Sequence, residues 1–314
     1  MNKMIFVISS RINMGDPHNT MLEGVFKKQK LDYCFLDIHR KNEFPICGYD
    51  KSGAFISYRG EKIKNPLFYV SSPLRQDSSM MIGVHYKYPQ VYRSAVNQYI
   101  EDLGFIFPDR WFPGSPQIIK AADSKLFLLT TAADNGLTIP KFTLNGQNPL
   151  KCQKVVYKKC LGYPLVISSK KGFAGEVAIT RTNKKMLNKG QAFDGLPWQW
   201  QEPIVSKYHV RVHIVGDNVW SVATTKENDL DLRSLKESEF TSLDWKTHEL
   251  PVSIKNKLRS LMRKLGLTFA SPEFIIDNRG NYILIDFNPC GDWVGFFDNK
   301  ISLDICEEHV SLLK

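Results

Sequence analysis

The chain has 314 residues, of which 43% are hydrophobic and 24% charged, an ordinary globular composition that allows two or three subdomains. Its formal net charge of +10 favours anionic partners such as a nucleotide or an acidic peptide, and no zinc-finger, RRM or KH signature favours nucleic acid. No apolar run is long enough to span a bilayer, so we expect no membrane partner. Six cysteines without metal-binding spacing indicate free thiols in a reducing cytoplasm.

The first hundred residues predict alternating strands and helices. The expected elements are a strand at 3–9, a helix at 19–29, a strand at 33–38, short strands near 54–58 and 67–70, and a helix at 91–103. A strand, a helix and a second strand in this order are typical of a parallel α/β layer. No GxGxxG or Walker motif follows the first strand, so a Rossmann dinucleotide site is not supported.

A breaker cluster at 111–116 marks the first expected boundary, and one helix is predicted after it, over 118–135. The next predicted strand, 161–167, leads into a loop at 168–176 that contains two glycines and a Lys-Lys pair. Glycine and lysine suit a loop whose amides and ammonium groups approach phosphates closely. The alternative is a solvated hairpin loop.

The following stretch predicts a strand and then a helix. Apolar and polar residues alternate over 208–215 before a Gly-Asp-Asn turn. The predicted helix 252–265 carries an apolar stripe of Ile254, Leu258, Leu261 and Leu265. We assign this stripe to the core, and the lysines and arginines on the other face to solvent.

The most informative stretch is a hairpin near the C-terminus, with strands at 273–276 and 282–288 joined by a polar turn. Because strand side chains alternate between faces, Asp286 and Asn288 point the same way, and Glu273 on the facing strand can come close to them. Two carboxylates and an amide oxygen suit Mg²⁺. Solvated positions on an ordinary hairpin are the alternative, but the apolar flanking residues leave no obvious solvent face.

Residues 286–293, Asp-Phe-Asn-Pro-Cys-Gly-Asp-Trp, resemble the metal-binding end of the ATP-grasp ligases. The most similar branch is the peptide-modifying one, with RimK-type glutamate ligases and the macrocyclases of microviridin-like graspetides. The usual form there is Glu-Xaa-Asn-Pro-Xaa-Gly-Gln-Trp, so Asp286 and Asp292 are departures. Glu273 stands where the family usually has Asp.

The resemblance implies an ATP-grasp fold of α/β and α+β parts. We expect an N-terminal α/β domain at 1–117, a central lid subdomain at 118–200, and a C-terminal α+β subdomain with the metal site at 201–314. Matching positions occur in family order from about Asp123 to Trp293. Each match is weak alone, but seven in order are hard to produce by chance.

The resemblance also implies phosphate-binding lysines. Lys125, after Asp123 and Ser124, stands where the family contacts nucleotide phosphate; without the family it is a helix lysine in solvent. Ser168 occupies the position of a second phosphate-binding lysine, and we expect Lys170 to replace it. A copy in which neither lysine reaches the phosphates would be slow or degenerate.

Further nucleotide and substrate contacts are implied downstream. His209 stands where an acid normally contacts ribose, and Arg211 matches the arginine of the same strand. We assign Arg233, in Asp-Leu-Arg before Leu250-Pro251, to a clamp on phosphate or carboxylate, and Asp244-Trp245-Lys246 is a rival match. The hinge whose backbone pairs with adenine corresponds to Gln201, Glu202 and Ile204.

The activity implied is that of a ligase using ATP and Mg²⁺. It would phosphorylate a carboxylate to an acyl phosphate, which an amine or hydroxyl then attacks to give an amide or ester, ADP and phosphate. The leading substrate is a leader-dependent, acidic precursor peptide whose Asp or Glu side chains are joined to Thr, Ser or Lys side chains. The alternatives are a ligase for a free amino acid or small amine, and a degenerate nucleotide- or peptide-binding relative. Dimerisation is frequent in the family and stays open.

Overall fold

The structure is a computed structural model. It describes residues 3–9, 15–38, 44–72, 89–145, 155–160, 165–168, 174–177, 179–183, 198–201, 204–225 and 243–314. Lys170, Glu202 and Arg233, which the sequence analysis singled out, lie outside these ranges.

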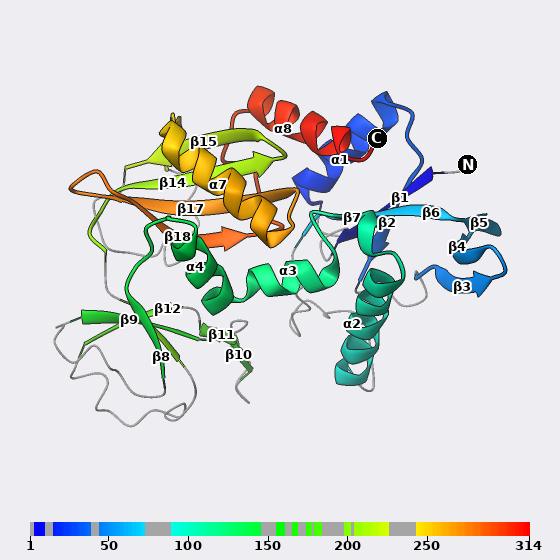
Figure 1. The fold of residues 1–314 in the computed structure, drawn as a ribbon, viewed down its shortest axis with the longest axis horizontal. Coiled ribbons are helices and arrows are strands. Elements are labelled where there is room, and N and C mark those ends of the chain that lie inside the picture. The colour runs from blue at the N-terminus through cyan, green and yellow to red at the C-terminus, as the bar shows by residue number, and fades with distance from the viewer. Residues whose placement is uncertain are drawn as a thin grey trace.

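The first sheet is parallel and has the strand order β2-β1-β6-β7 (Figure 1). Its strands are β1 (Lys3–Ser9), β2 (Tyr33–Asp37), β6 (Asn65–Val70) and β7 (Trp111–Phe112), and its helices are α1 (Pro17–Lys28) and α2 (Pro89–Ile106), followed by the short helix η2 (Pro108–Arg110). The strands β1 and β6 are almost entirely buried, as in a sheet covered on both faces. The expected parallel α/β layer is thus confirmed.

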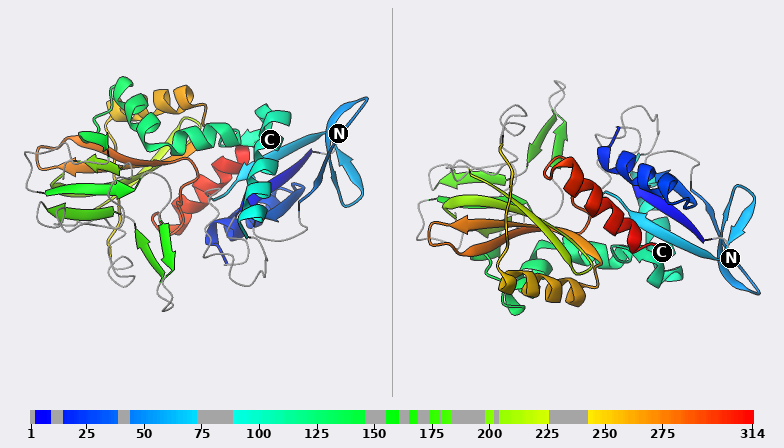
Figure 2. Two further views of the ribbon diagram at one scale, coloured as in Figure 1. Left: turned by 90° about the horizontal axis from the view of Figure 1, so that it is seen from below. Right: turned by 90° about the horizontal axis from the view of Figure 1, so that it is seen from above.

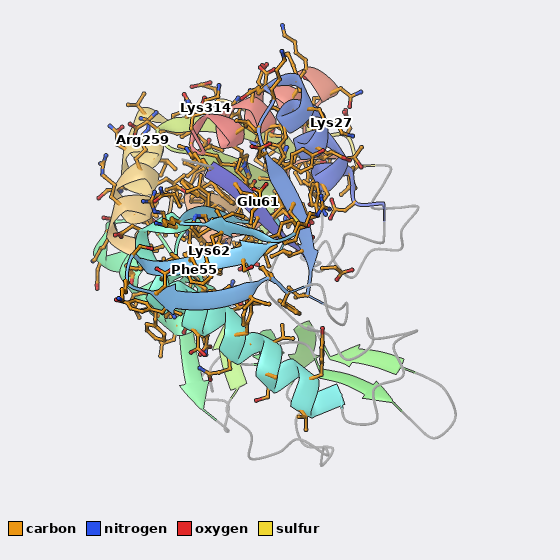
Figure 3. All side chains as sticks on the ribbon, turned by 90° about the vertical axis from the view of Figure 1, so that its right-hand side faces the viewer. Lys27, Phe55, Glu61, Lys62, Arg259 and Lys314 are labelled. Carbon is orange, nitrogen blue, oxygen red and sulfur yellow. The ribbon has the colours of Figure 1, made fainter. Side chains whose placement is uncertain are left out.

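A small antiparallel sheet of β3 (Ile46–Asp50), β4 (Gly53–Tyr58) and β5 (Glu61–Ile63) extends this first layer. Lys62 on β5 places its ammonium 4.4 Å from the ring centroid of Phe55 on β4 (Figure 3). The same ammonium lies 3.0 Å from a carboxylate oxygen of Asp50 on β3. Lys62 on β5 therefore contacts side chains of both β3 and β4.

The single helix expected over 118–135 is wrong: the chain forms α3 (Pro116–Asp123) and α4 (Lys125–Asp134). The break lies at Ser124, whose backbone is extended (φ −71°, ψ 108°) and ends one helix as it begins the next. The apolar pattern alone does not reveal the break, because both helices bury one face. The break brings Lys125 into the first turn of α4.

Two further sheets follow α4. One has the order β12-β9-β13-β8, and the other is the hairpin β10-β11. Their strands are β8 (Phe142–Asn145), β9 (Val155–Cys160), β10 (Leu165–Ser168), β11 (Ala174–Val177), β12 (Ile179–Asn183) and β13 (Trp198–Gln201). The strand expected at 161–167 thus corresponds to β10, and residues 161–164 lie outside the described part of the chain.

The largest sheet has the order β16-β15-β14-β17-β18 and is antiparallel throughout. Its strands are β14 (Ser206–Val215), β15 (Asn218–Thr224), β16 (Lys246–Thr247), β17 (Phe269–Asp277) and β18 (Tyr282–Asn288). The expected strand at 208–215 and the expected hairpin are therefore confirmed. The hairpin strand β17 begins four residues earlier than predicted.

Helices cover both faces of this sheet (Figures 1 and 2). On one face lies α7 (Val252–Leu265), whose bounds agree with the prediction and whose Leu258, Leu261 and Leu265 pack into the core with Val212 and Phe274. On the other lies α8 (Asn299–Ser311), a helix that was not predicted; Figure 2 shows it between the sheet and α1. Residues of α1, β1, β6, β14, β17 and α8 share a second core, which joins the first layer to the large sheet.

Two expectations from composition can be compared with the described residues. Cys34, Cys47, Cys290 and Cys306 are free thiols, as predicted. No described helix combines the length and the hydropathy needed to cross a membrane.

Candidate functional site

Three neighbouring strands bring the main predicted site residues into one line. In the sheet register Arg211 on β14 lies opposite Glu273 on β17, and Glu273 lies opposite Asp286 on β18. Directly paired residues in an antiparallel sheet project on the same face, with Cβ atoms about 5 Å apart. The sheet thus presents a positive group and two negative groups side by side.

A bulge in β18 makes this alignment possible. The register passes from Glu273↔Asp286 to Phe274↔Leu284, so Ile285 is an extra residue. In a regular strand Leu284 and Asp286 would share a face, and the carboxylate of Asp286 would enter the core beside the fully buried Leu284. The extra residue turns Asp286 to the opposite face, beside Glu273, as bulges near functional sites commonly do.

Each carboxylate of the row has a cationic partner. Arg211 Nη2 lies 2.9 Å from Glu273 Oε1, and Lys125 Nζ binds Asp286 Oδ1. We call these four residues the charged row. Their side chains are 14–32% exposed, so the ion pairs are partly shielded from water but remain accessible to it.

Lys125 occupies an unusual position for a lysine. It is the first residue of α4, where the partial positive charge of the helix end disfavours a cation. The chain beyond α4 runs beside β18, where the amide of Leu284 donates a hydrogen bond of 2.8 Å to the carbonyl of Thr138. This contact fixes α4 against the strand that carries Asp286. The alternative of a fully solvated helix lysine is therefore wrong.

Arg211 is held by a ring as well as by a carboxylate. Its guanidinium carbon lies 3.9 Å from the ring centroid of Phe296, in the loop after β18, and Phe296 meets the ring of Trp245 edge-on at 5.5 Å. The Nε atom of Arg211 is buried without a hydrogen-bond partner among the described residues. The alternative of an ordinary surface arginine on the strand is thus wrong. Phe296 was missed because the contact joins distant segments and no sequence pattern announces it.

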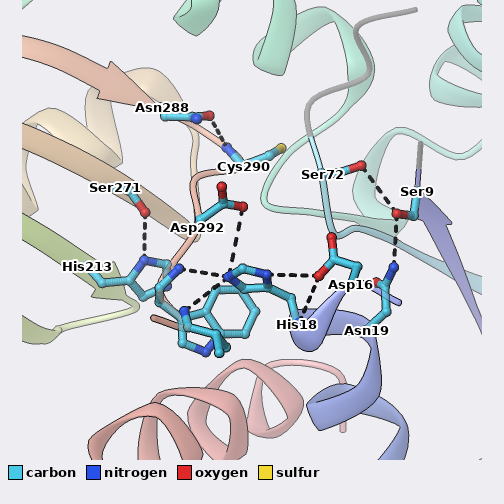
Figure 4. A network of polar contacts seen from close by, with 12 residues as sticks. Ser9, Asp16, His18, Asn19, Ser72, His213, Ser271, Asn288, Cys290 and Asp292 are labelled. Atoms are coloured by element: carbon cyan, nitrogen blue, oxygen red, sulfur yellow. Dashed lines mark hydrogen bonds and ion pairs between the residues drawn. The ribbon is translucent and has the colours of Figure 1, made fainter. Parts of the chain in front are cut away.

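Asn288, the third expected oxygen ligand, ends β18 opposite Ser271. Its side-chain oxygen accepts a hydrogen bond of 3.0 Å from the amide of Cys290, which fixes the orientation of the side chain (Figure 4). Gly291 passes so close to Ser271 that an added Cβ would lie 2.4 Å from the Ser271 Cβ. A glycine is therefore required here, in the motif that carried the resemblance.

The chemistry of the donor set fits Mg²⁺. Hard oxygen ligands from one or two carboxylates, with the rest of the shell from water and phosphate, are typical of this ion. No group of three His, Cys, Asp or Glu side chains in the described ranges could hold a metal ion. The expected set has only two carboxylates, so it relies on the amide oxygen of Asn288 and on ligands from outside the chain.

The remaining predicted residues are placed in part. His209 is buried on β14 two residues before Arg211, so both side chains project from the same face. Gln201 ends β13, paired with Phe142 and Tyr157, and Ile204 is half-buried in the link to β14.

A buried chain of neutral groups continues from the charged row. Ser271 Oγ lies 2.7 Å from His213 Nδ1, His213 Nε2 lies 2.7 Å from His309 Nε2, and His309 Nδ1 lies 3.0 Å from the hydroxyl of Tyr69. We call these four residues the histidine chain. It was not predicted, because its members come from β17, β14, α8 and β6.

Burial determines the protonation of the histidine chain. Both imidazoles are fully buried, and this lowers the pKa of His213 to about 3 and the pKa of His309 well below its ordinary value. The same burial raises the pKa of Tyr69. All these groups are therefore neutral at pH 7.

No family model matches this sequence, and no curated protein matches it either. Among solved structures, the fold is similar to that of macrocyclase MdnC bound with precursor peptide MdnA from Microcystis aeruginosa MRC. The TM-score is 0.75 at 18% identity, over 98% of this chain and 99% of that chain.

Two further solved structures are similar over nearly their whole length. One is a Chryseobacterium gregarium RiPP-associated ATP-grasp ligase in complex with ADP and a leader and core peptide, with a TM-score of 0.75, 15% identity and coverage of 99% of this chain and 97% of that chain. The other is the ATP-grasp ligase PsnB complexed with minimal precursor, Mg and ADP, with a TM-score of 0.70, 16% identity and coverage of 99% and 97%. The chain therefore has the ATP-grasp fold, as the sequence of residues 286–293 predicted.

Proposed function

We propose that this chain is an ATP- and Mg²⁺-dependent ligase that activates a carboxylate as an acyl phosphate. The observation that carries the proposal is the charged row, in which two adjacent carboxylates on β17 and β18 lie between a cation on β14 and a cation on α4. Surface ion pairs contribute little to stability, so a bulge and a broken helix that align four such groups point to binding. The solved structures with the same fold include ligases complexed with ADP, which supports a nucleotide as the ligand.

The metal ligands in this proposal are Glu273, Asp286 and Asn288. When bound, Mg²⁺ would supply positive charge beside the β- and γ-phosphates of ATP. Glu273 and Asp286 are ion-paired with Arg211 and Lys125 in the structure. A cation that competes for the two carboxylates would leave the guanidinium and the ammonium available to phosphate oxygens.

The reaction follows from this exchange of partners. A substrate carboxylate oxygen attacks the γ-phosphorus, the bond to ADP breaks, and Lys125 and Arg211 stabilise the charge on the phosphoryl oxygens. An amine or hydroxyl then attacks the acyl carbon, phosphate leaves, and the nucleophile loses its proton. No nucleophile on the protein is required. Arg211 is well suited to hold a phosphate because the ring of Phe296 fixes the plane of its guanidinium.

The proposed substrate is an acidic precursor peptide, whose Asp or Glu side chains are joined to Thr, Ser or Lys side chains of the same peptide. The net charge of +10 suits such a substrate. MdnC and the Chryseobacterium gregarium ligase were both solved with peptides, which supports a peptide here.

The proposal includes residues outside the described ranges and a division of the chain. Lys170 and Arg233 would contact phosphate or carboxylate, and the backbone around Gln201, Glu202 and Ile204 would contact adenine, with His209 near ribose. The lid would comprise residues 118–200, between an N-terminal domain at 1–117 and a C-terminal subdomain at 201–314.

A thermal-shift titration with Mg-ADP and Mg-ATP tests the nucleotide site. A ligand present at about 100 times its dissociation constant should stabilise the folded chain by roughly 2.7 kcal/mol. We expect a stabilisation that needs Mg²⁺ and that Asp286→Ala abolishes, because the variant loses a metal ligand and the partner of Lys125. An absent shift in the unmodified chain would contradict the proposal. Mg-dependent binding without ATP consumption in the presence of an acidic, Thr/Ser/Lys-containing peptide would instead favour the degenerate relative.

A further inference from the structure

The loop after β18, residues 289–298, holds two parts of the proposed site. It begins directly after Asn288, and the ring centroid of its Phe296 lies 3.9 Å from the guanidinium carbon of Arg211. The position of this loop therefore affects both a proposed metal ligand and a proposed phosphate contact.

The middle of the loop is fixed from another part of the chain, by His18 in the first turn of α1. The amides of Trp293 and Val294 both donate to His18 Nε2, each at 3.0 Å. Figure 4 shows the imidazole reaching from α1 towards the segment that carries Cys290 and Asp292. The ring of His18 also meets Trp293 edge-on, with centroids 4.5 Å apart.

These contacts define the tautomer of His18. Since Nε2 accepts from two amides, it carries a lone pair and no proton, and the ring proton lies on Nδ1. Nδ1 donates to Asp16 Oδ1 at 2.9 Å, and the same oxygen caps α1 by accepting from the His18 amide at 2.8 Å. The imidazole is thus clamped between a helix cap on one side and the loop on the other.

His18 is almost fully buried. The carboxylate of Asp292 comes no nearer to Nε2 than 3.9 Å, which is too long for a hydrogen bond. At the two ends of the loop, Gly291 packs against Ser271 and Phe296 packs against Arg211. His18 supplies the fixed point between them.

We propose that His18 is a positioning residue for the magnesium-nucleotide site: from the first α/β layer, it fixes the loop between Asn288 and Phe296. This inference rests on the proposed function. The first α/β layer would then support the nucleotide site without touching the nucleotide. Hydrogen-bond partners of metal ligands act in a similar way, because they orient the ligands from outside the coordination shell.

The test measures the Mg²⁺ concentration needed for ADP binding, by calorimetry at a temperature well below unfolding. His18→Leu removes the acceptor and should raise that concentration by about 10- to 100-fold, the range found for outer partners of metal sites. His18→Gln places an amide oxygen near the position of Nε2 and should recover most of the loss. Hydrogen exchange should show the amides of Trp293 and Val294 exposed in His18→Leu and protected in His18→Gln.

Asn19→Leu is the matched control. Asn19 is the next residue on α1, is similarly buried, and donates to Ser9 Oγ instead of contacting the loop. It should lower the melting temperature and leave the Mg²⁺ requirement unchanged. If His18→Leu does not fold, Asp16→Ala serves in its place, because it frees Nδ1 and should change the Mg²⁺ requirement in the same direction.

An unchanged Mg²⁺ requirement in a folded His18→Leu would overturn the inference and leave the proposed function intact. The same change in Asn19→Leu would also overturn it, since the effect would then follow general loss of stability. Absence of Mg-dependent ADP binding in the unmodified chain would overturn the proposed function and this inference together.

Discussion

The charged row and the histidine chain share one face of β14 and β17, yet their chemistry is opposite. Arg211 and His213 are two residues apart on β14, and Ser271 and Glu273 are two residues apart on β17. Towards solvent, the side chains of the row are partly exposed and form ion pairs. Towards the core, both histidines are fully buried and neutral.

Burial explains the difference, because the backbone geometry is the same. A charge at the partly exposed end is paired and partly solvated, so it can change partners when a ligand arrives. A charge at the buried end would have no water to solvate it, so the side chains of the histidine chain form their hydrogen bonds in the neutral state. We therefore expect the row to respond to ligands and the histidine chain to respond to pH.

The largest expected effect is the loss of stability at low pH that follows from the buried, neutral histidine chain. An unfolded histidine has a pKa of about 6.5, while His213 and His309 resist protonation when folded. Below pH 6.5 the unfolded chain binds protons that the folded chain does not, so the free energy of unfolding falls as the pH falls. For His213 this loss continues to about pH 3, where the folded side chain is itself protonated.

Each histidine that stays unprotonated in the folded chain contributes up to about 1.4 kcal/mol per pH unit below pH 6.5, so the two together should give a slope of up to about 3 kcal/mol per pH unit. Urea unfolding at several pH values measures this slope. His309→Gln keeps hydrogen-bonding groups and cannot be protonated, so it should lose about half of the slope. A slope that is the same in His309→Gln would contradict the assignment to these histidines.

The second effect should appear in the charged row. Glu273→Gln removes one proposed metal ligand charge and should weaken Mg-dependent ADP binding by about 100-fold, or about 2.7 kcal/mol. The variant should change the free energy of unfolding by no more than about 1 kcal/mol, because the pair with Arg211 is partly exposed.

Glu307→Gln is the control for this charge removal. Glu307 on α8 forms a 2.9 Å pair with Lys28 on α1, and neither residue belongs to the charged row. It should leave ADP binding unchanged. Calorimetric titration measures the ADP affinity of both variants. Equal weakening of ADP binding in the two would mean that the overall charge, and not the charged row, attracts the nucleotide.

The smallest effect should come from the ring beneath Arg211. Phe296→Leu keeps an apolar side chain and removes the cation–π contact, which is typically worth about 1 kcal/mol. ADP binding should weaken roughly fivefold as Arg211 loses its fixed plane. Phe55→Leu removes the comparable contact with Lys62 on the small outer sheet and should leave ADP affinity unaltered. Equal ADP affinity in Phe296→Leu and the unmodified chain would mean that Phe296 does not orient Arg211.

Much of the fold followed from local patterns. The bounds of the 252–265 helix, the hairpin strands and the first parallel layer were predictable, because apolar spacing and turn residues specify them within a few positions. The missed elements include the short strands β3 and β5 and the helix α8, whereas the short strands expected near 54–58 and 67–70 are present as β4 and β6; the helix over 118–135 was wrongly predicted as continuous. Local spacing does not encode a break whose role is to present Lys125 to a distant strand.

The sequence alone determined the oxygen-rich hairpin, the parallel first layer and the resemblance to ATP-grasp ligases, because these depend on residues close together in the chain. Tertiary structure decided the rest of the site. Only the register of β14, β17 and β18 pairs Arg211 with Glu273, and only the bulge brings Asp286 beside Glu273. The contact of His18 with the loop joins residues some 275 positions apart. Contacts at that separation arise from packing of whole layers, and no short pattern in the sequence records them.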